Sequence, residues 1–121
     1  MRLPLLLMLL TTTGALAADR QRVPPATLVG EPVSCIPLQA IRESRVYDDR
    51  TIDFVMSGKR AYRNVLPHAC PGLGFERRFA YETSLSQLCS TDIVTVLYQT
   101  GPARGASCGL GQFQPVTLPR R

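Results

Sequence analysis

An apolar stretch at the start of the chain constrains the rest of the sequence most, because it decides the environment in which the chain folds. Arg2 precedes a leucine-rich run over residues 3–10, and Ala15-Leu16-Ala17 has the small residues of a signal-peptide cleavage site. The run is shorter than the roughly 20 residues that cross a bilayer as a helix. A buried N-terminal strand or helix is the alternative. We predict that residues 1–17 are a secretion signal and that the protein is periplasmic or secreted.

Four cysteines follow this segment, namely Cys35, Cys70, Cys89 and Cys108. An even number in a small exported chain predicts two disulfides, which could form in three pairings. If strands alternate in direction, Cys35 and Cys89 lie at one end of the sheet and the other two at the opposite end. A Cys70–Cys89 bond would then have to cross on the order of 25–30 Å, whereas a disulfide needs Cα atoms within about 7 Å. We therefore predict Cys35–Cys89 and Cys70–Cys108.

Loss of the signal would leave 104 of the 121 residues and lower the net charge from +5 to +4, because Arg2 is removed. That length suits one small domain. We expect residues 18–32, which are polar and contain prolines, to be a disordered lead-in, residues 33–118 to be a single β domain, and residues 119–121 to be a tail. A core of about 85 residues is marginal by itself, so the disulfides, worth roughly 2–4 kcal/mol each, matter for folding.

Residues 46–66 are predicted to form two successive hairpins, with a turn at Asp48-Asp49-Arg50. Apolar and polar residues alternate over residues 51–57, and Gly58 marks the second turn. A two-residue turn would place Phe54 opposite Arg63, and a three-residue turn would place Phe54 opposite Asn64. We favour the three-residue turn, because it gathers the apolar side chains on one face. Asn64 shares that face and requires a hydrogen-bond partner. The apolar members of the face are Ile52, Phe54, Met56, Tyr62 and Leu66.

Further strands are predicted at residues 41–47, 75–83, 93–98 and 110–118. The strand at 93–98 is β-branched and apolar, so we place it centrally. Pro115 should confine the last strand to an edge. Residues 101–109 are expected to be a loop, and residues 84–89 a corner with one helical turn capped by Ser84. The fold class is therefore all-β: a small antiparallel barrel or sandwich stapled by disulfides, with at most one short helical turn.

Six short motifs occur in a set order along the chain. They are Cys35-Ile36-Pro37-Leu38, Asp48-Asp49-Arg50-Thr51-Ile52, Tyr62-Arg63-Asn64-Val65-Leu66, Cys70-Pro71-Gly72-Leu73, Leu88-Cys89-Ser90-Thr91-Asp92-Ile93 and Cys108-Gly109-Leu110-Gly111-Gln112-Phe113. Together they resemble a family of small exported proteobacterial proteins that is catalogued only as a domain of unknown function. The resemblance covers residues 35–116. It implies a periplasmic or secreted bacterial protein and brings no activity with it.

No metal or cofactor is expected from the sequence. The cysteine spacings do not match a zinc site, and the acidic cluster of Asp48, Asp49 and Asp53 lacks calcium-loop spacing. Turn capping is the simpler role for these aspartates. The only histidine, His68, lies two residues before Cys70, which suggests a Cys–His nucleophile. A disulfide at Cys70 would remove the thiolate that this chemistry needs.

Two activities remain as alternatives. A secreted ribonuclease could use His68 with Glu76 or Glu82 as an acid–base pair, and Arg77 or Arg78 to hold a phosphate. The competing interpretation places Glu76, Arg77 and Arg78 on the solvated side of a strand. The second alternative is an inhibitor of an envelope-directed enzyme, in which an exposed hairpin tip enters a cleft. That tip consists of Ser57, Gly58 and Lys59.

Arginines alternate with aromatic rings between residues 54 and 81, a pattern that also suits single-stranded nucleic acid. These rings, including Phe75, are expected to be needed for the core instead, so no nucleic-acid partner is predicted. The mild positive charge favours an anionic component of the envelope. Our functional prediction is an exported, non-catalytic binding or structural module of the bacterial cell envelope, with no membrane span after signal removal.

Overall fold

The computed structural model describes residues 23–58, 60–83, 85–100 and 104–118, and within them antiparallel strands dominate. The largest sheet contains, in spatial order, β1 (Thr27–Leu28), β10 (Phe113–Thr117), β5 (Ala61–Val65), β4 (Thr51–Met56) and β3 (Ile41–Val46). A three-stranded sheet contains β6 (Phe79–Tyr81), β8 (Ile93–Leu97) and β9 (Arg104–Gly109). The third sheet pairs β2 (Cys35–Pro37) with β7 (Gln87–Cys89). The predicted signal and tail lie outside the described residues.

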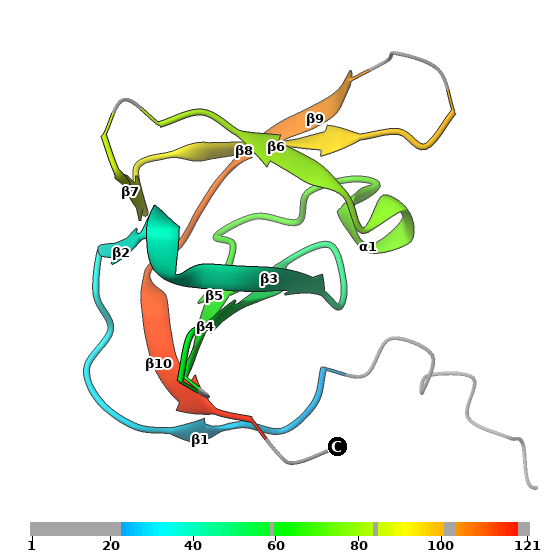
Figure 1. Cartoon of the computed structure of the whole chain (residues 1–121). Helices are drawn as coiled ribbons and strands as arrows, with labels where there is room; N and C mark the ends of the chain where they lie inside the picture. The colour runs from blue at the N-terminus through cyan, green and yellow to red at the C-terminus, as the bar shows by residue number, and fades with distance from the viewer. Residues whose placement is uncertain (1–22, 59, 84, 101–103, 119–121) are drawn as a thin grey trace, which may run out of the picture.

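The predicted all-β antiparallel class is confirmed, and the sheets are open. In Figure 1 the three-stranded sheet lies above the five-stranded one, with β2 and β7 at one side. Within the described ranges no sheet closes on itself, so the closed barrel is not found. In the part of the chain that the structure describes, two short helical elements occur where at most one was predicted: a 3-10 turn at Leu38–Ala40 and the four-residue helix α1 (Leu73–Glu76). No described helix is long and apolar enough to cross a membrane.

One apolar core is shared by all three sheets. Phe54 on β4 is fully buried and packs edge-on against Phe113 of β10, with ring centroids 5.7 Å apart, and against Phe79 of β6, at 6.3 Å. It therefore connects the two larger sheets, since aromatic pairs favour this geometry. Ile36 of β2 and Leu88 of β7 are also fully buried and bring the smallest sheet into the same cluster.

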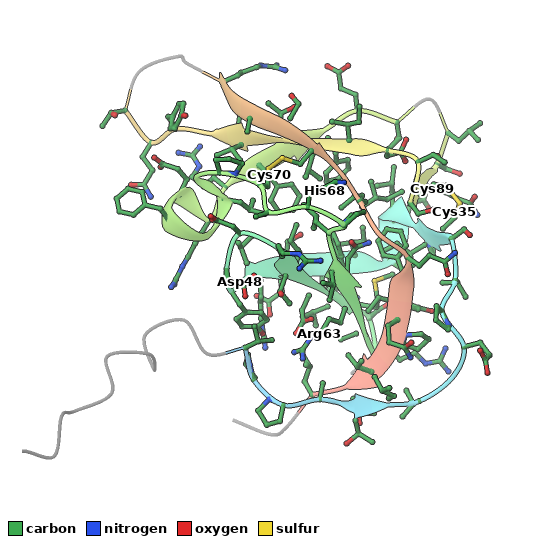
Figure 2. All side chains as sticks on the ribbon, turned by 180° about the vertical axis from the view of Figure 1, so that it is seen from behind. Cys35, Asp48, Arg63, His68, Cys70 and Cys89 are labelled. Atoms are coloured by element: carbon green, nitrogen blue, oxygen red, sulfur yellow. A yellow bond between two sulfur atoms is a disulfide. The ribbon has the colours of Figure 1, made fainter. Side chains whose placement is uncertain are left out.

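Two disulfides join these elements, in the predicted pairing. Cys35 and Cys89 are direct cross-strand partners in β2 and β7, with Cα atoms 4.0 Å apart. Cys70, in the loop after β5, is bonded to Cys108 of β9 with Cα atoms 5.8 Å apart, so this bond links the five-stranded region to the three-stranded sheet (Figure 2). No described cysteine is free. The predicted pairing is correct, although the strand predicted at residues 75–83, on which the prediction relied, is reduced to Phe79–Tyr81.

The central hairpin has the predicted faces but a different register. Phe54 lies opposite Tyr62, and not opposite Asn64 as predicted or Arg63 as in the alternative. The N–H of Met56 donates to the carbonyl of Arg60 at 2.7 Å, which joins the two strands at the end of the hairpin. The observed register differs from the predicted one by two residues. A shift of two keeps every side chain on its face, so apolar alternation cannot distinguish the two registers.

The strand predicted at 75–83 is reduced to β6, because the preceding segment turns into α1. Gly72 at φ 86° and Arg77 at φ 56° flank this helix in left-handed conformations, and the Arg77 N–H donates to the Leu73 carbonyl at 2.8 Å. These contacts complete one helical turn where alternation had indicated a strand. The predicted helical turn at 84–89 is wrong for Gln87–Cys89, which is β7, and its predicted cap, Ser84, lies outside the described residues.

β8 lies between β6 and β9, as the prediction of a central strand requires. The expected loop at 101–109 is wrong for Arg104–Gly109, which is strand β9, and its first three residues lie outside the described residues. Gly, Ala and Ser are weak strand formers, and pairing with β8 decides their conformation here. Gly105 packs closely against Tyr98, because a Cβ at this position would lie 3.1 Å from the Tyr98 Cζ.

The short strand β1 contradicts two predictions, the disordered lead-in at residues 18–32 and the edge position of the last strand. Thr27–Leu28 forms β1 and pairs with β10, so residues 18–32 are not disordered throughout, and β10 is not an edge. The N–H of Val29 donates to the carbonyl of Pro115 at 3.1 Å. Because the N–H and C=O of a residue point to the same neighbour in an antiparallel pair, the missing N–H of Pro115 faces the two-residue strand β1. The sheet thus loses no hydrogen bond between β10 and β5 at this residue.

Asn64 has the hydrogen-bond partner that the sequence required. Its side chain is fully buried, its Nδ2 donates to the carbonyl of Gly111 at 2.7 Å, and its Oδ1 accepts the Gly111 N–H at 2.9 Å. This two-way contact secures the segment before β10 against β5. All buried side-chain polar atoms of the described residues have a hydrogen-bond partner.

We predict that Asn64→Ala lowers the free energy of unfolding by roughly 2–3 kcal/mol, because it leaves a backbone donor and acceptor of Gly111 without their partner. Urea unfolding followed by circular dichroism measures the change. Val65→Ala is the control, since Val65 is exposed on the same strand, and it should cost under about 1 kcal/mol. Equal losses in the two variants would contradict a specific role for the amide.

Candidate functional site

A row of polar side chains crosses the outer face of the five-stranded sheet. Ile52, Phe54 and Met56 of β4 belong to the core, so the intervening Asp53 points to the opposite face. Cross-strand pairing places Asp53 between Arg45 of β3 and Arg63 of β5, and Arg63 opposite Gln114 of β10. We call these four residues, Arg45, Asp53, Arg63 and Gln114, the polar row.

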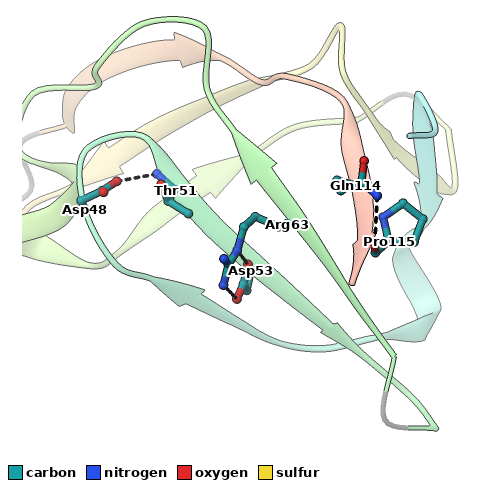
Figure 3. A network of polar contacts seen from close by, with 6 residues as sticks. All are labelled: Asp48, Thr51, Asp53, Arg63, Gln114 and Pro115. Carbon is teal, nitrogen blue, oxygen red and sulfur yellow. Dashed lines mark hydrogen bonds and ion pairs between the residues drawn. The ribbon is translucent and has the colours of Figure 1, made fainter. Parts of the chain in front are cut away.

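An ion pair lies at the centre of the polar row. Nε of Arg63 donates to Oδ1 of Asp53 at 2.8 Å, and Nη2 donates to Oδ2 at 2.9 Å (Figure 3). Asp53 is fully buried and the Arg63 side chain is 16% exposed. This two-point geometry is the strongest form of an arginine–carboxylate contact. Both carboxylate oxygens are occupied and shielded, so Asp53 stabilises the sheet and is not placed to meet a ligand.

Tyr47 borders the ion pair. The guanidinium carbon of Arg63 lies 5.9 Å from the centroid of its ring, within the range of a cation–π contact. Burial raises the pKa of the Tyr47 phenol above its ordinary value, and the negative charge of Asp53 raises it further. The hydrogen bond to Asp53, followed by its negative charge, raises the pKa of Arg63 against the opposing effect of burial. The polar row thus favours neutral tyrosine and charged arginine.

The Asp48 side chain caps its turn, as expected, whereas the side chains of Asp49 and Asp53 bind Gly74 and Arg63 instead. Oδ1 of Asp48 accepts the N–H groups of Arg50 at 2.8 Å and Thr51 at 2.7 Å. Oδ1 of Asp49 accepts the N–H of Gly74 at 2.8 Å. Nowhere in the described ranges do three or more His, Cys, Asp or Glu residues form a group that could hold a metal ion.

The residues proposed for a ribonuclease site are exposed or committed elsewhere. His68 is exposed in the loop that precedes Cys70 (Figure 2). The carboxylate of Glu76 accepts the N–H of Gln99 at 3.2 Å. Arg77 and Arg78 are both exposed, but they follow α1 and do not lie on the solvated side of a long strand. None of the three cavities described below is lined by any of these four residues.

Glu82, the alternative acid–base partner, lines a cavity of about 330 Å³ beside β6 and β8. Asp92 and Arg104 line the same cavity, so it contains two carboxylates and a guanidinium. Oδ2 of Asp92 already accepts the N–H of Cys89 at 2.7 Å. The sequence analysis did not associate Arg104 with Glu82, because it treated residues 101–109 as a loop. Only the pairing of β9 with β8 brings Arg104 to this place.

Two further cavities lie near β1 and β10. One of about 460 Å³ is lined by residues of three segments: Val29, Arg60, Ala61, Tyr62, Pro115, Val116 and Thr117. The other, of about 280 Å³, is lined by Pro25, Ala26, Thr27, Thr117 and Leu118. Neither contains an acidic residue or a histidine, so neither offers an acid–base pair.

The predicted hairpin tip is exposed where it is described. Ser57 and Gly58 are exposed, and Gly58 adopts φ 82° with no atom within 4 Å of where a Cβ would lie. Lys59, the third predicted residue of the tip, lies outside the described residues. The tip is therefore open on the side where a side chain would project.

Phe75 is the residue that the sequence analysis misassigned most clearly. It was expected in the core, yet it is 84% exposed at α1. The signal that could have identified it is the spacing of Gly72 and Gly74 before it, which favours a tight turn over a strand.

Comparison with known proteins adds no constraint, since no protein-family model, curated protein or solved structure matches this chain.

We predict that Arg63→Ala lowers the free energy of unfolding by about 3–5 kcal/mol, because it leaves a buried carboxylate without its partner. The double variant Asp53→Val with Arg63→Met should recover most of that loss, since it removes both charges. Urea unfolding at neutral pH measures both changes. The control is Arg42→Ala, an exposed residue of β3 outside the polar row. A loss no larger than that of the control would contradict a buried, paired Asp53.

The raised pKa of Tyr47 predicts a loss of stability in alkali. Above the ordinary tyrosine pKa of about 10, the unfolded chain releases the phenol proton while the folded chain retains it. Stability from this residue is therefore complete below pH 10 and is lost as the pH rises towards the pKa of the folded state. Tyr47→Phe should flatten the fall in urea midpoint above pH 10. Tyr98→Phe, at an exposed position, is the control, and an unchanged slope in Tyr47→Phe would refute the prediction.

Proposed function

We propose that this protein is an exported, non-catalytic binding module of the bacterial cell envelope, periplasmic or secreted, and a member of the small proteobacterial family that its motifs resemble. The observation that carries the proposal is the use of all four cysteines in two disulfides around one shared core. Structural disulfides of this kind are typical of oxidising compartments. Within this proposal the open sheets serve as a small sandwich scaffold for exposed loops.

The positions of the candidate catalytic residues favour binding over catalysis. Acid–base catalysis requires its groups within hydrogen-bond reach of one reacting atom. His68 is exposed in a loop, Glu76 accepts a backbone hydrogen bond from Gln99, and Glu82 lines a separate cavity with Arg104. The charged pair with the best geometry, Asp53 and Arg63, is shielded within the sheet. These facts support a protein whose exposed surfaces bind a partner.

An inhibitor of an envelope-directed enzyme is the second candidate. The observation in its favour is the exposed hairpin tip at Ser57 and Gly58, closed at its base by the hydrogen bond from Met56 to Arg60. Inhibitors often use such projecting turns, because a turn held by its own strands loses little entropy on binding.

The proposal is tested with the oxidised protein recovered from the exporting host. We expect no reactive thiols under denaturing conditions, and retention on at least one isolated envelope fraction, namely peptidoglycan sacculi, lipopolysaccharide or anionic phospholipid vesicles. We also expect equal, background-level ribonuclease activity for the parent and His68→Ala. Four reactive thiols would refute the export argument. Ribonuclease activity that His68→Ala abolishes would establish an enzyme instead.

The inhibitor alternative makes a different prediction. If the hairpin tip enters an enzyme cleft, Gly58→Trp should abolish inhibition of an envelope-directed hydrolase while it leaves envelope binding unchanged. Inhibition by the parent that this variant lacks would favour the second candidate over the first. No retention on any of the three fractions, together with no inhibition, would overturn both.

A further inference from the structure

An exposed aromatic ring lies close in sequence to two exposed arginines at one end of the molecule. Phe75 of α1 is 84% exposed, and Arg77 and Arg78 follow it after Glu76. Tyr98, 39% exposed, lies at the end of β8. The two segments are neighbours, because Glu76 accepts the N–H of Gln99 and Arg78 accepts the N–H of Leu97. We call Phe75, Arg77, Arg78 and Tyr98 the aromatic–arginine tip.

The segment that carries the aromatic–arginine tip is firmly held. Leu73 is fully buried in the core, and the N–H of Gly74 donates to Asp49. A Cβ on Gly74 would lie 2.9 Å from the Asp48 backbone, so this part of α1 packs directly on the turn between β3 and β4. Cys70, three residues before Leu73, is bonded to β9. Successive helical residues point about 100° apart, so anchoring Leu73 and Gly74 directs Phe75 outwards (Figure 1 shows α1 at the edge of the molecule).

The cations of this tip are the exposed Arg77 and Arg78. Three acidic residues lie beside α1, and each has a carboxylate oxygen that accepts a backbone N–H: Asp48 from Arg50 and Thr51, Asp49 from Gly74, and Glu76 from Gln99. Arg77 adopts φ 56°, the only positive φ of a non-glycine residue in the described ranges. This left-handed conformation ends α1, and the Arg77 N–H donates to the Leu73 carbonyl, so the arginine lies directly after the helix turn that carries Phe75. The tip therefore offers one large apolar ring and two cations, on a chain whose net charge is +5.

We propose that the aromatic–arginine tip docks on the surface of an anionic phospholipid bilayer. Phe75 enters the interface between headgroups and acyl chains, Tyr98 lies at headgroup level, and Arg77 and Arg78 bind lipid phosphates. This inference rests on the proposed envelope location and names the component that is bound. Charge complementarity between the arginines and an anionic leaflet selects the partner.

The size of the apolar surface favours a bilayer over a protein partner. A stable protein interface buries about 1,200–2,000 Å² and is built around a well-packed core. A single ring with a half-exposed tyrosine is much smaller than that. A bilayer needs no matching socket, since its interface accepts any apolar group flanked by cations. Such docking is reversible and weak, and it weakens further as salt screens the arginines.

Vesicle co-sedimentation of the exported, oxidised chain tests the proposal. We expect binding to vesicles of phosphatidylethanolamine with phosphatidylglycerol, loss of binding at high salt, and little binding to phosphatidylcholine. Phe75→Ala should lower the partition coefficient about tenfold, because it removes most of the inserted apolar area. Arg77→Gln with Arg78→Gln should lower it by about the same factor.

Matched controls separate docking from folding. Leu85→Ala removes another exposed apolar side chain, 71% exposed in the loop before β7, and Arg42→Gln removes another exposed arginine. Both should bind vesicles like the parent. Arg77→Gly removes one cation and also the left-handed strain, so it should bind less tightly while its unfolding midpoint is equal to or higher than that of the parent. Reduced binding in the controls equal to that of Phe75→Ala would overturn the proposal.

A spectroscopic variant reports insertion directly. The chain contains no tryptophan, so Phe75→Trp places a single tryptophan at the tip, which can be excited selectively over the tyrosines. We expect its emission to shift to the blue on addition of anionic vesicles, as the indole leaves water. An unshifted emission from vesicle-bound protein would refute insertion at this residue.

The outcomes also separate this inference from the proposed function. Retention on sacculi or lipopolysaccharide without vesicle binding would overturn lipid docking and leave the envelope module intact. Binding to none of the three fractions would overturn both. Failure to bind vesicles, combined with Phe75-dependent capture of a protein, would show that the tip is a protein-binding site instead.

Discussion

The turn between β3 and β4 is the contact on which the arrangement of the two larger sheets depends. Asp48 bonds the backbone of Arg50 and Thr51 and so shapes the turn. Asp49 accepts the N–H of Cys70 through its carbonyl and the N–H of Gly74 through its side chain. Because Cys70 is also bonded to Cys108 of β9, the turn between β3 and β4 connects the five-stranded sheet, α1 and the three-stranded sheet.

This connection divides the molecule into a rigid interior and an exposed end. Inside, the shared core around Phe54 and the buried ion pair between Asp53 and Arg63 lie on opposite faces of β4. At the end, α1 is anchored through Leu73 and leaves Phe75 in solvent. The strongest electrostatic contact thus serves the fold, while the exposed aromatic residue serves no packing role. The proposed surface-binding function rests on that separation.

Sequence patterns predicted correctly those features that depend on residues close together in the chain. Alternation identified the faces of β4 and β5 and the need of Asn64 for a partner, and aspartates marked the turn at 48–49. They failed at residues 73–78 and 104–109. In the first case backbone conformations at Gly72 and Arg77 overrode alternation. In the second, pairing with β8 overrode the low strand propensity of glycine, alanine and serine. The candidate site was predicted least well, since Phe75 was assigned to the core.

The sequence alone determined the all-β class and the apolar faces of β4 and β5, because both follow from periodicity and composition. The disulfide pairing was predicted correctly from an assumed strand over residues 75–83, which the structure replaces with α1 and the short β6, so the tertiary structure decided it. Tertiary structure alone decided the register of the central hairpin, since a shift of two residues leaves the apolar faces unchanged. It also decided that Asp53 is buried with Arg63, that Arg104 lies beside Glu82, and that Phe75 is exposed. These features depend on contacts between residues far apart in the chain, which no local pattern records.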